Sequence, residues 1–154
     1  MAASSSLRSL ARRGALAFGA GLLASGIAAA APKAYVGNFK DSTVSVIDTA
    51  TNAVVATVPV AAGPHGMAVS PDGRSVWVAG EGSTHVSVID TASDSVARTV
   101  DVGASPHGLS MLPDGRTVLV GVYGADRVAF VDTASGAVAA TVAVAKPHTI
   151  AVRP

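Results

Sequence analysis

The chain has 154 residues, of which 49% are hydrophobic and 14% are charged, and its formal net charge is +1. It contains no cysteine, which excludes a disulfide framework, a thiolate zinc site and a cysteine nucleophile. This length suits one domain with a modest hydrophobic core.

Residues 1–30 differ in composition from the rest of the chain. Three arginines precede an apolar stretch rich in Ala and Gly, over residues 14–31, which ends in Ala28-Ala-Ala-Ala-Pro32. A basic region, an apolar region and a small-residue cleavage site together are typical of a signal peptide. We predict cleavage after Ala30 and export to the periplasm or the cell surface. An uncleaved membrane anchor and a twin-arginine signal remain as alternatives.

The charges are divided unevenly by this cleavage. Of the 11 Lys and Arg residues, Arg8, Arg12 and Arg13 lie in the signal segment, whereas none of the 10 Asp and Glu residues does. The remaining domain, residues 31–154, therefore has a net charge of −2. No basic surface for nucleic acid is expected on it, nor a stable membrane span after cleavage.

Short Val-rich runs separated by turn residues follow from residue 34 onward. In the first repeat they cover residues 34–39, 43–49 and 53–60, and in the second 75–80, 84–91, 95–102 and 107–112. Alternation of Val with small polar residues, bounded by Gly, Pro and Asp, indicates β-strands. The period is fixed, because Asp48, Asp90 and Asp132 are 42 residues apart. Four antiparallel strands in about 40 residues are the unit of a propeller blade, so we predict an all-β chain of three four-stranded blades.

One motif punctuates these repeats. Pro64-His-Gly-Met-Ala-Val-Ser-Pro-Asp-Gly73 recurs over residues 106–115 and begins again at Pro147. Together with Ala34-Tyr-Val-Gly-Asn38 and Val44-Ser-Val-Ile-Asp-Thr-Ala50, it resembles the YVTN-type β-propeller repeat of exported bacterial and archaeal proteins, including surface-layer proteins. The resemblance covers residues 34–154 and implies a propeller. Propellers of that family usually have about seven blades, within the general range of about 4 to 8, whereas this chain supplies three repeats.

The strands are offset by one relative to the blades. The first repeat lacks an innermost strand, and a spare innermost strand is predicted over residues 148–152. Two chains could therefore form a six-bladed ring in which each completes the first blade of the other. An open arc and a fragment of a longer propeller are the alternatives. We favour self-association, because an open arc exposes apolar faces and sheet edges.

Large apolar residues in phase with the repeat are predicted to pack between blades rather than to form a ligand pocket. They are Tyr35, Trp77 and Leu119 on second strands, and Val44, Val46, Val86, Val88, Val128 and Phe130 on third strands.

Three histidines, His65, His107 and His148, recur at the entry to innermost strands. Repeat symmetry predicts that they surround the mouth of the propeller channel, where they are our candidate ligand-binding residues. Three converging imidazoles could bind Zn²⁺ or Cu²⁺. We favour a structural role instead, in which each ring hydrogen-bonds a backbone group of the neighbouring blade and the adjacent Gly permits close approach. Equivalent positions on adjacent blades are expected to be too far apart to share a metal ion. His85 is out of phase and is predicted to be an exposed residue at a strand start.

The repeated carboxylates are predicted to cap turns rather than to catalyse. They are Asp48, Asp90 and Asp132 before Thr-Ala turns, and Asp72 and Asp114 in Pro-Asp-Gly turns. Glu81, the only glutamate, lies in a Gly-Glu-Gly loop without an evident partner. No Ser-His-Asp arrangement, phosphate loop or dinucleotide fingerprint is present in the sequence.

These features favour an exported, non-catalytic binding or protein-interaction module without a cofactor, whose ligand meets the loops at the channel mouth. The resemblance also implies an alternative, a propeller enzyme or enzyme subunit similar to lactonases or quinoprotein dehydrogenases. Binding of single-stranded nucleic acid is a third hypothesis, which the negative charge of residues 31–154 disfavours.

Overall fold

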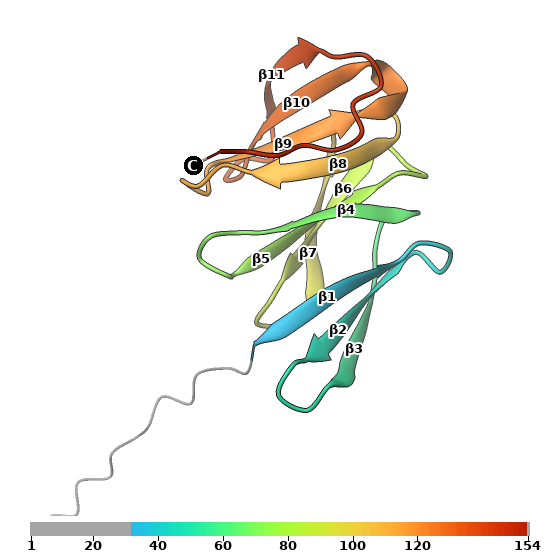
Figure 1. Ribbon diagram of the computed structural model, residues 1–154, viewed down its shortest axis with the longest axis vertical. Coiled ribbons are helices and arrows are strands. Elements are labelled where there is room, and N and C mark those ends of the chain that lie inside the picture. Colours follow the sequence, from blue (N-terminus) through green and yellow to red (C-terminus); the bar gives the residue numbers. More distant parts are fainter. Residues whose placement is uncertain (1–31, 154) are drawn as a thin grey trace, which may run out of the picture. The chain divides into compact units, whose positions relative to one another are not determined.

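The computed structural model describes residues 32–153, which form three antiparallel β-sheets (Figure 1). Blade 1 contains β1 (Lys33–Asn38), β2 (Thr43–Asp48) and β3 (Ala53–Pro59). Blade 2 contains β4 (Pro64–Val69), β5 (Ser75–Gly80), β6 (His85–Asp90) and β7 (Ser95–Asp101). Blade 3 contains β8 (Pro106–Met111), β9 (Thr117–Val122), β10 (Arg127–Asp132) and β11 (Val138–Ala143), with a short 3-10 helix η1 (Tyr123–Ala125) after β9.

The predicted all-β architecture of propeller blades is confirmed. In each sheet the strands pair with their neighbours in chain order, and the strand ends predicted for the first two repeats differ from the observed ends by at most one residue. The predicted signal peptide over residues 1–30 lies outside the described residues. Within residues 32–153, no helix has the length and apolarity needed to span a membrane.

One predicted strand is not formed. Residues 148–152 follow blade 3 without regular secondary structure, so the described residues contain eleven strands rather than twelve. A β-strand exists through its ladder of hydrogen bonds to a neighbouring strand. In the described part of the chain, no strand forms such a ladder with residues 148–152.

The strand ladders are interrupted at repeat-equivalent places. The last two strands of every blade in chain order change register at one position, after Val46, Val88 and Phe130. The innermost ladders open between Pro64 and Met67, and again between Pro106 and Leu109. Such irregularities redirect side chains. The interruptions of the innermost ladders include the His-Gly pair of each Pro-His-Gly motif.

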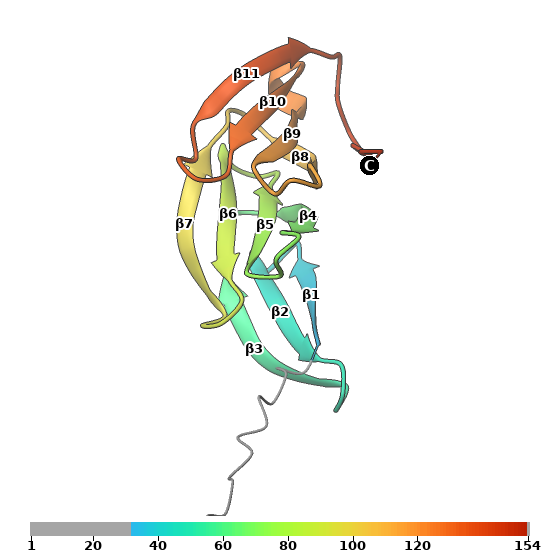
Figure 2. The same ribbon diagram turned by 90° about the vertical axis from the view of Figure 1, so that its left-hand side faces the viewer.

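The blades are stacked in chain order (Figure 2), with an apolar core in each of the two interfaces. Val44 and Val46 of blade 1 pack with Val76, Val78 and Ile89 of blade 2. The opposite face of blade 2 packs on blade 3 in a second cluster that includes Trp77, Val86, Val88, Val118, Val120, Ala129 and Val131. The packing predicted from the repeat phase is therefore found in blades 1 and 2.

Blade 3 departs from the predicted core. Leu119, Val128 and Phe130 are only partly buried, whereas Ala129 and Val131 are fully buried. The residues equivalent to Val128 and Phe130 in the other blades face the next blade along the chain. No blade of the described residues covers that face of blade 3, so its apolar residues remain partly exposed.

The turn aspartates have the predicted capping role. The Oδ1 atom of Asp48 accepts hydrogen bonds from the backbone N–H groups of Ala50 and Thr51 at 2.8 and 3.1 Å. Asp90 accepts equivalent bonds from Ala92 and Ser93. The hydrogen bonds from the backbone and hydroxyl of Ser93 lower the pKa of Asp90. These contacts explain the repeated Asp as local turn chemistry.

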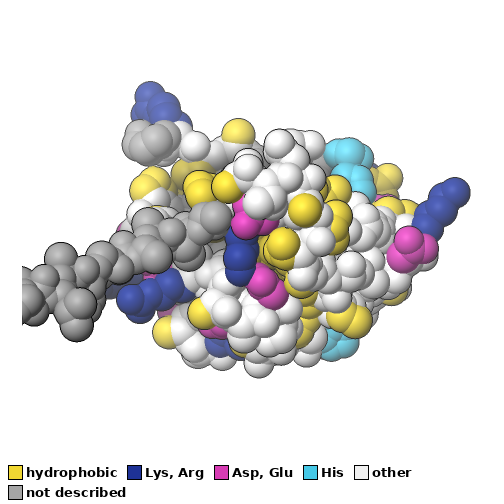
Figure 3. All heavy atoms as spheres, turned by 90° about the horizontal axis from the view of Figure 1, so that it is seen from below, with side chains coloured by type: hydrophobic (Ala, Val, Ile, Leu, Met, Phe, Trp, Pro, Cys, Tyr) yellow, Lys and Arg dark blue, Asp and Glu magenta, His cyan; other side chains and the backbone are white. Residues whose placement is uncertain are grey.

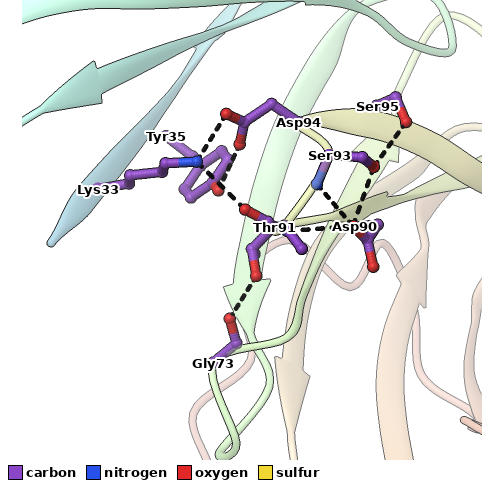
Figure 4. A network of polar contacts seen from close by, with 9 residues as sticks. Lys33, Tyr35, Gly73, Asp90, Thr91, Ser93, Asp94 and Ser95 are labelled. Carbon is purple, nitrogen blue, oxygen red and sulfur yellow. Dashed lines mark hydrogen bonds and ion pairs between the residues drawn. The ribbon is translucent and has the colours of Figure 1, made fainter. Parts of the chain in front are cut away.

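A polar network also joins blades 1 and 2 (Figure 4). The Nζ atom of Lys33 in β1 lies 2.6 Å from Oδ2 of Asp94, in the turn between β6 and β7. The hydroxyl of Tyr35 donates to Oδ1 of the same carboxylate at 3.1 Å. Viewed from the blade 1 end, charged side chains of both signs are scattered among apolar and uncharged ones (Figure 3).

Candidate functional site

The three repeated histidines converge in one stack. The ring centroids of His65 and His107 are 3.7 Å apart, and those of His107 and His148 are 3.8 Å apart. The outer rings, His65 and His148, have centroids separated by 5.9 Å, so His107 lies between them. The rings of neighbouring histidines are thus in contact, and the expectation that the three histidines are too far apart to share a metal ion stays a prediction.

Glycine permits this close approach. An added Cβ atom at Gly66 would lie 2.4 Å from the backbone oxygen of His107, and one at Gly108 would lie 2.1 Å from that of His148. No side chain fits at such distances, so each glycine lets its innermost segment touch the Pro-His pair of the next repeat. This is the contact predicted from the Pro-His-Gly motif, and it holds for residues 147–149 although they are not a strand.

His107 is the anchored member of the stack. Its side chain is buried, with the residue 5% exposed, and its Nδ1 atom lies 3.1 Å from the backbone oxygen of His148. A carbonyl oxygen can only accept, so Nδ1 carries the proton in this hydrogen bond and the lone pair of a neutral ring is on Nε2. The predicted hydrogen bond to a neighbouring backbone group is thus confirmed for His107, whereas His65 and His148 are exposed.

Glu81 belongs to the same site, although the residues predicted from the sequence did not include it. Its Oε2 atom lies 3.7 Å from Nε2 of His107. The loop that carries it is held beside the Pro-His-Gly loop, because the N–H groups of Glu81 and Gly82 donate to the backbone oxygens of Gly63 and Ala62. The pairing of Pro64 with Gly80 brings these loops together. A signal was present, since the end of one antiparallel strand lies beside the start of its partner.

Two aromatic rings flank the stack. Phe39 lies edge-on to His65, with ring centroids 6.4 Å apart. Tyr123 of η1 lies 6.0 Å from His107 between centroids, and the Lys146 ammonium lies 5.0 Å from the centre of the Tyr123 ring. We call the surface formed by Phe39, His65, Glu81, His107, Tyr123 and His148 the histidine face.

The histidine face can hold a metal ion. His65, Glu81 and His107 each offer one ligand atom, and these atoms all lie within 4.8 Å of one another. His148 contributes its ring to the stack but is not part of this set. Two imidazoles and one carboxylate are also groups that can exchange protons with a bound molecule.

His85 is separate from the stack. It begins β6 and is partly exposed, and its Nδ1 atom lies 3.1 Å from the Thr84 hydroxyl. The prediction that it is a residue at a strand start is confirmed, which makes it a suitable control position.

A cavity of about 330 Å³ offers a second candidate site in the described residues, lined by residues that include Asp72, Trp77, Arg98, Asp114 and Thr133. The Arg98 guanidinium lies 5.3 Å from the Trp77 ring centre. It also donates hydrogen bonds to the backbone oxygens of Ala134 and Thr133. Because this cation is already engaged within the protein, it is less suited to recognising a ligand.

A family model described as YNCE-like beta-propeller matches residues 5–114. No curated protein matches the chain.

Solved structures are similar to this chain over most of its length. The hydrazine synthase of Kuenenia stuttgartiensis is 26% identical, with a TM-score of 0.73 over 76% of this chain and 34% of that one. The dihydro-heme d1 dehydrogenase NirN, solved in complex with DHE, is 28% identical, with a TM-score of 0.63 over 70% of this chain and 23% of that one. The chain thus spans about a third or less of these two relatives.

Proposed function

Because the chain belongs to the YNCE-like β-propeller family, we propose that it is a non-catalytic binding or protein-interaction module whose ligand contacts the histidine face. One observation carries the proposal. Three separate Pro-His pairs, two of them followed by Gly, bring His65, His107 and His148 into one stack, with neighbouring centroids 3.7 and 3.8 Å apart.

The chemistry of this face suits recognition. Exposed rings at His65 and His148, with Phe39 and Tyr123 beside them, combine apolar surface with hydrogen-bonding atoms. Binding sites commonly combine these properties. The buried ring of His107 holds the centre of the stack in place through its bond to the backbone of His148. A ligand would therefore meet groups that are already positioned.

The proposal also covers the cellular location of the protein and the type of its repeats. We propose that the protein is exported to the periplasm or the cell surface and that its repeats are of the YVTN type found in surface-layer and related proteins. The basic, apolar and small-residue parts of residues 1–30 support export. The in-phase Pro-His-Gly and Asp-Thr-Ala motifs support the assignment of the repeats to the YVTN type.

A second candidate function is that of a propeller enzyme or enzyme subunit, lactonase-like or quinoprotein-dehydrogenase-like. The names of the two solved relatives, a hydrazine synthase and a dihydro-heme d1 dehydrogenase, favour it. Because the chain spans only part of those proteins, their activities are weaker support than the geometry of the chain's own residues. Turnover of a lactone or of a reduced electron donor by the purified protein would favour this candidate.

A fragment screen tests the binding function. We would titrate a library of small soluble aromatic and carboxylate fragments into the ¹⁵N-labelled protein and map amide shift changes. The expected changes gather at residues 63–66, 81–83, 106–108 and 147–149. They should disappear in a His65→Ala, His148→Ala double variant and persist in His85→Ala. Changes that gather instead around Trp77 and Arg98, or that survive the double variant, would contradict the proposal.

A further inference from the structure

We propose that His65, Glu81 and His107 bind one zinc ion. The inference rests on the proposed function, because it gives the histidine face a ligand of defined chemistry. The motifs of the sequence pointed to three histidines, but the ligand set inferred from the geometry differs from that triad. Glu81 replaces His148, whose ring lies on the other side of His107.

The spacing of the ligand atoms is close to that of a zinc site. Zinc binds imidazole nitrogen and carboxylate oxygen at about 2.0 to 2.2 Å, so ligand atoms around a tetrahedral ion lie about 3.3 Å apart. The Nε2 atom of His107 and Oε2 of Glu81 are 3.7 Å apart, and all three ligand atoms lie within 4.8 Å of one another. Rotation of the exposed His65 and the partly exposed Glu81 side chains would bring these atoms to coordination distance.

His107 is prepared for coordination. Its Nδ1–H donates to the backbone oxygen of His148 at 3.1 Å, which leaves Nε2 free to offer its lone pair on the side of Glu81. The separation of 3.7 Å between Nε2 and Oε2 is too long for a hydrogen bond. Metal-binding histidines in general donate their other ring N–H to a carbonyl or carboxylate, which fixes the tautomer and orients the ring.

The donor set selects the class of metal ion. Two imidazoles and one carboxylate suit zinc and neighbouring transition metals, whereas Mg²⁺ and Ca²⁺ prefer sites made of oxygen atoms alone. Three protein ligands also leave one position of a tetrahedral ion for water or for a group of a bound molecule. That position is where a zinc ion would meet the ligand of the binding module.

Equilibrium dialysis of the 154-residue protein, prepared without a histidine tag, against Zn²⁺ tests the proposal. We expect one zinc ion per chain by elemental analysis. Glu81→Gln and His65→Ala should each raise the Kd by about tenfold or more. His85→Ala should leave the Kd within about twofold of the unsubstituted protein, because His85 lies outside the site. His148→Ala should raise the Kd less than Glu81→Gln does, because its side chain is not a ligand in the proposed set.

A second measurement does not depend on a substitution. Co²⁺ in place of Zn²⁺ should give the strong visible absorption of a four-coordinate ion, and Glu81→Gln should weaken it. Mg²⁺ in excess should not displace the bound Co²⁺. Because Glu81 is on a loop and partly exposed, Glu81→Gln is expected to fold, which unfolding in urea would verify.

Three results would each overturn the zinc site. The first is a content of fewer than one zinc ion per chain, and the second is a Kd that does not change in Glu81→Gln and His65→Ala. The third is a loss of zinc affinity in His148→Ala as large as that in Glu81→Gln. If fragments bind the histidine face but the protein takes up no zinc, the zinc site is rejected and the proposed binding function stands. Zinc binding without any fragment at this face would support the zinc site and contradict the broader binding function.

Discussion

The Nδ1 atom of His107 donates a hydrogen bond to the backbone oxygen of His148, which is 41 residues farther along the chain. The bond ties β8 of blade 3 to the segment that follows the last strand. Gly108, next to His107, provides the close contact that makes the bond possible, since an added Cβ would lie 2.1 Å from the same oxygen. The histidine stack and the docking of residues 147–149 therefore depend on each other.

Replacing Gly108 by Ala should separate these segments. The new Cβ would overlap the backbone oxygen of His148, and relieving overpacked contacts of this kind typically costs about 1 to 3 kcal/mol. Urea unfolding of Gly108→Ala should show this loss of stability. Gly82→Ala is the matched control, because its Cβ would lie 3.3 Å from the nearest atom. Equal stability of the two variants would contradict the structural role of Gly108.

Replacing His107 by Phe should remove the hydrogen bond and keep a ring in the stack. The oxygen of His148 would lose its partner, and a hydrogen bond within a protein typically contributes about 0.5 to 1.5 kcal/mol. We expect a loss of this size in the free energy of unfolding, measured in urea. His85→Phe, at a partly exposed strand start, should change it by about 0.5 kcal/mol or less. A His107→Phe protein as stable as the His85→Phe protein would show that the bond is dispensable.

Tyr35 should ionise only at high pH. Its burial and, to a lesser extent, its hydrogen bond to Asp94 raise its pKa from 10.0 to about 12. A folded pKa above the unfolded one stabilises the protein fully below pH 10, and this contribution is lost as the pH rises through about 12. Absorbance titration of tyrosinate, with Tyr35→Phe used to identify the signal, measures the value.

Asp94→Asn separates the two causes of this shift. It should lower the pKa of Tyr35 but leave it above 10.0, because burial is the larger cause. In Tyr35→Phe, the stability lost between pH 10 and 12 should be smaller than in the unsubstituted protein. A Tyr35 midpoint near 10.0 would mean that its hydroxyl is solvated rather than held at the junction of blades 1 and 2.

We propose, in addition, that two chains associate. In blade 1, β1 is an edge strand, and residues 148–152 have no strand partner among the described residues. Val36, Phe39 and Val54 are exposed on the same blade. An edge strand and an unpaired segment with the sequence of an innermost strand can complete one another between two copies. Light scattering is expected to give the mass of a dimer.

Substitution at Ile150 tests the strand pairing directly. Ile150→Pro removes a backbone N–H and should shift the protein to a monomer, because proline cannot donate to a sheet ladder. Ile150→Val keeps the N–H and should remain a dimer. A monomeric mass for the unsubstituted protein, or a dimer that tolerates Ile150→Pro, would contradict this mode of association.

Much of the fold was predictable because it is encoded locally. The alternation of Val with small polar residues and the turn residues at a period of 42 were enough to predict the strands of the first two repeats to within a residue. The capping role of Asp48 and the burial of Trp77 follow from the same patterns. These features depend on neighbours within one repeat, or on the equivalence of repeats, and both can be read from the sequence.

The candidate site depended on distances between repeats. The sequence identified His65, His107 and His148 as equivalent, but only the packed blades show their rings within 3.8 Å of a neighbour. Glu81 joins them because the loops before β4 and after β5 meet at the open end of this hairpin, and the position of its side chain beside His107 depends on the packed blades. Likewise, the partial exposure of Phe130 and the missing ladder at residues 148–152 depend on what lies beside them. Strand identity and turns are thus set by local chemistry, whereas proximity, burial and pairing are decided by the assembled blades.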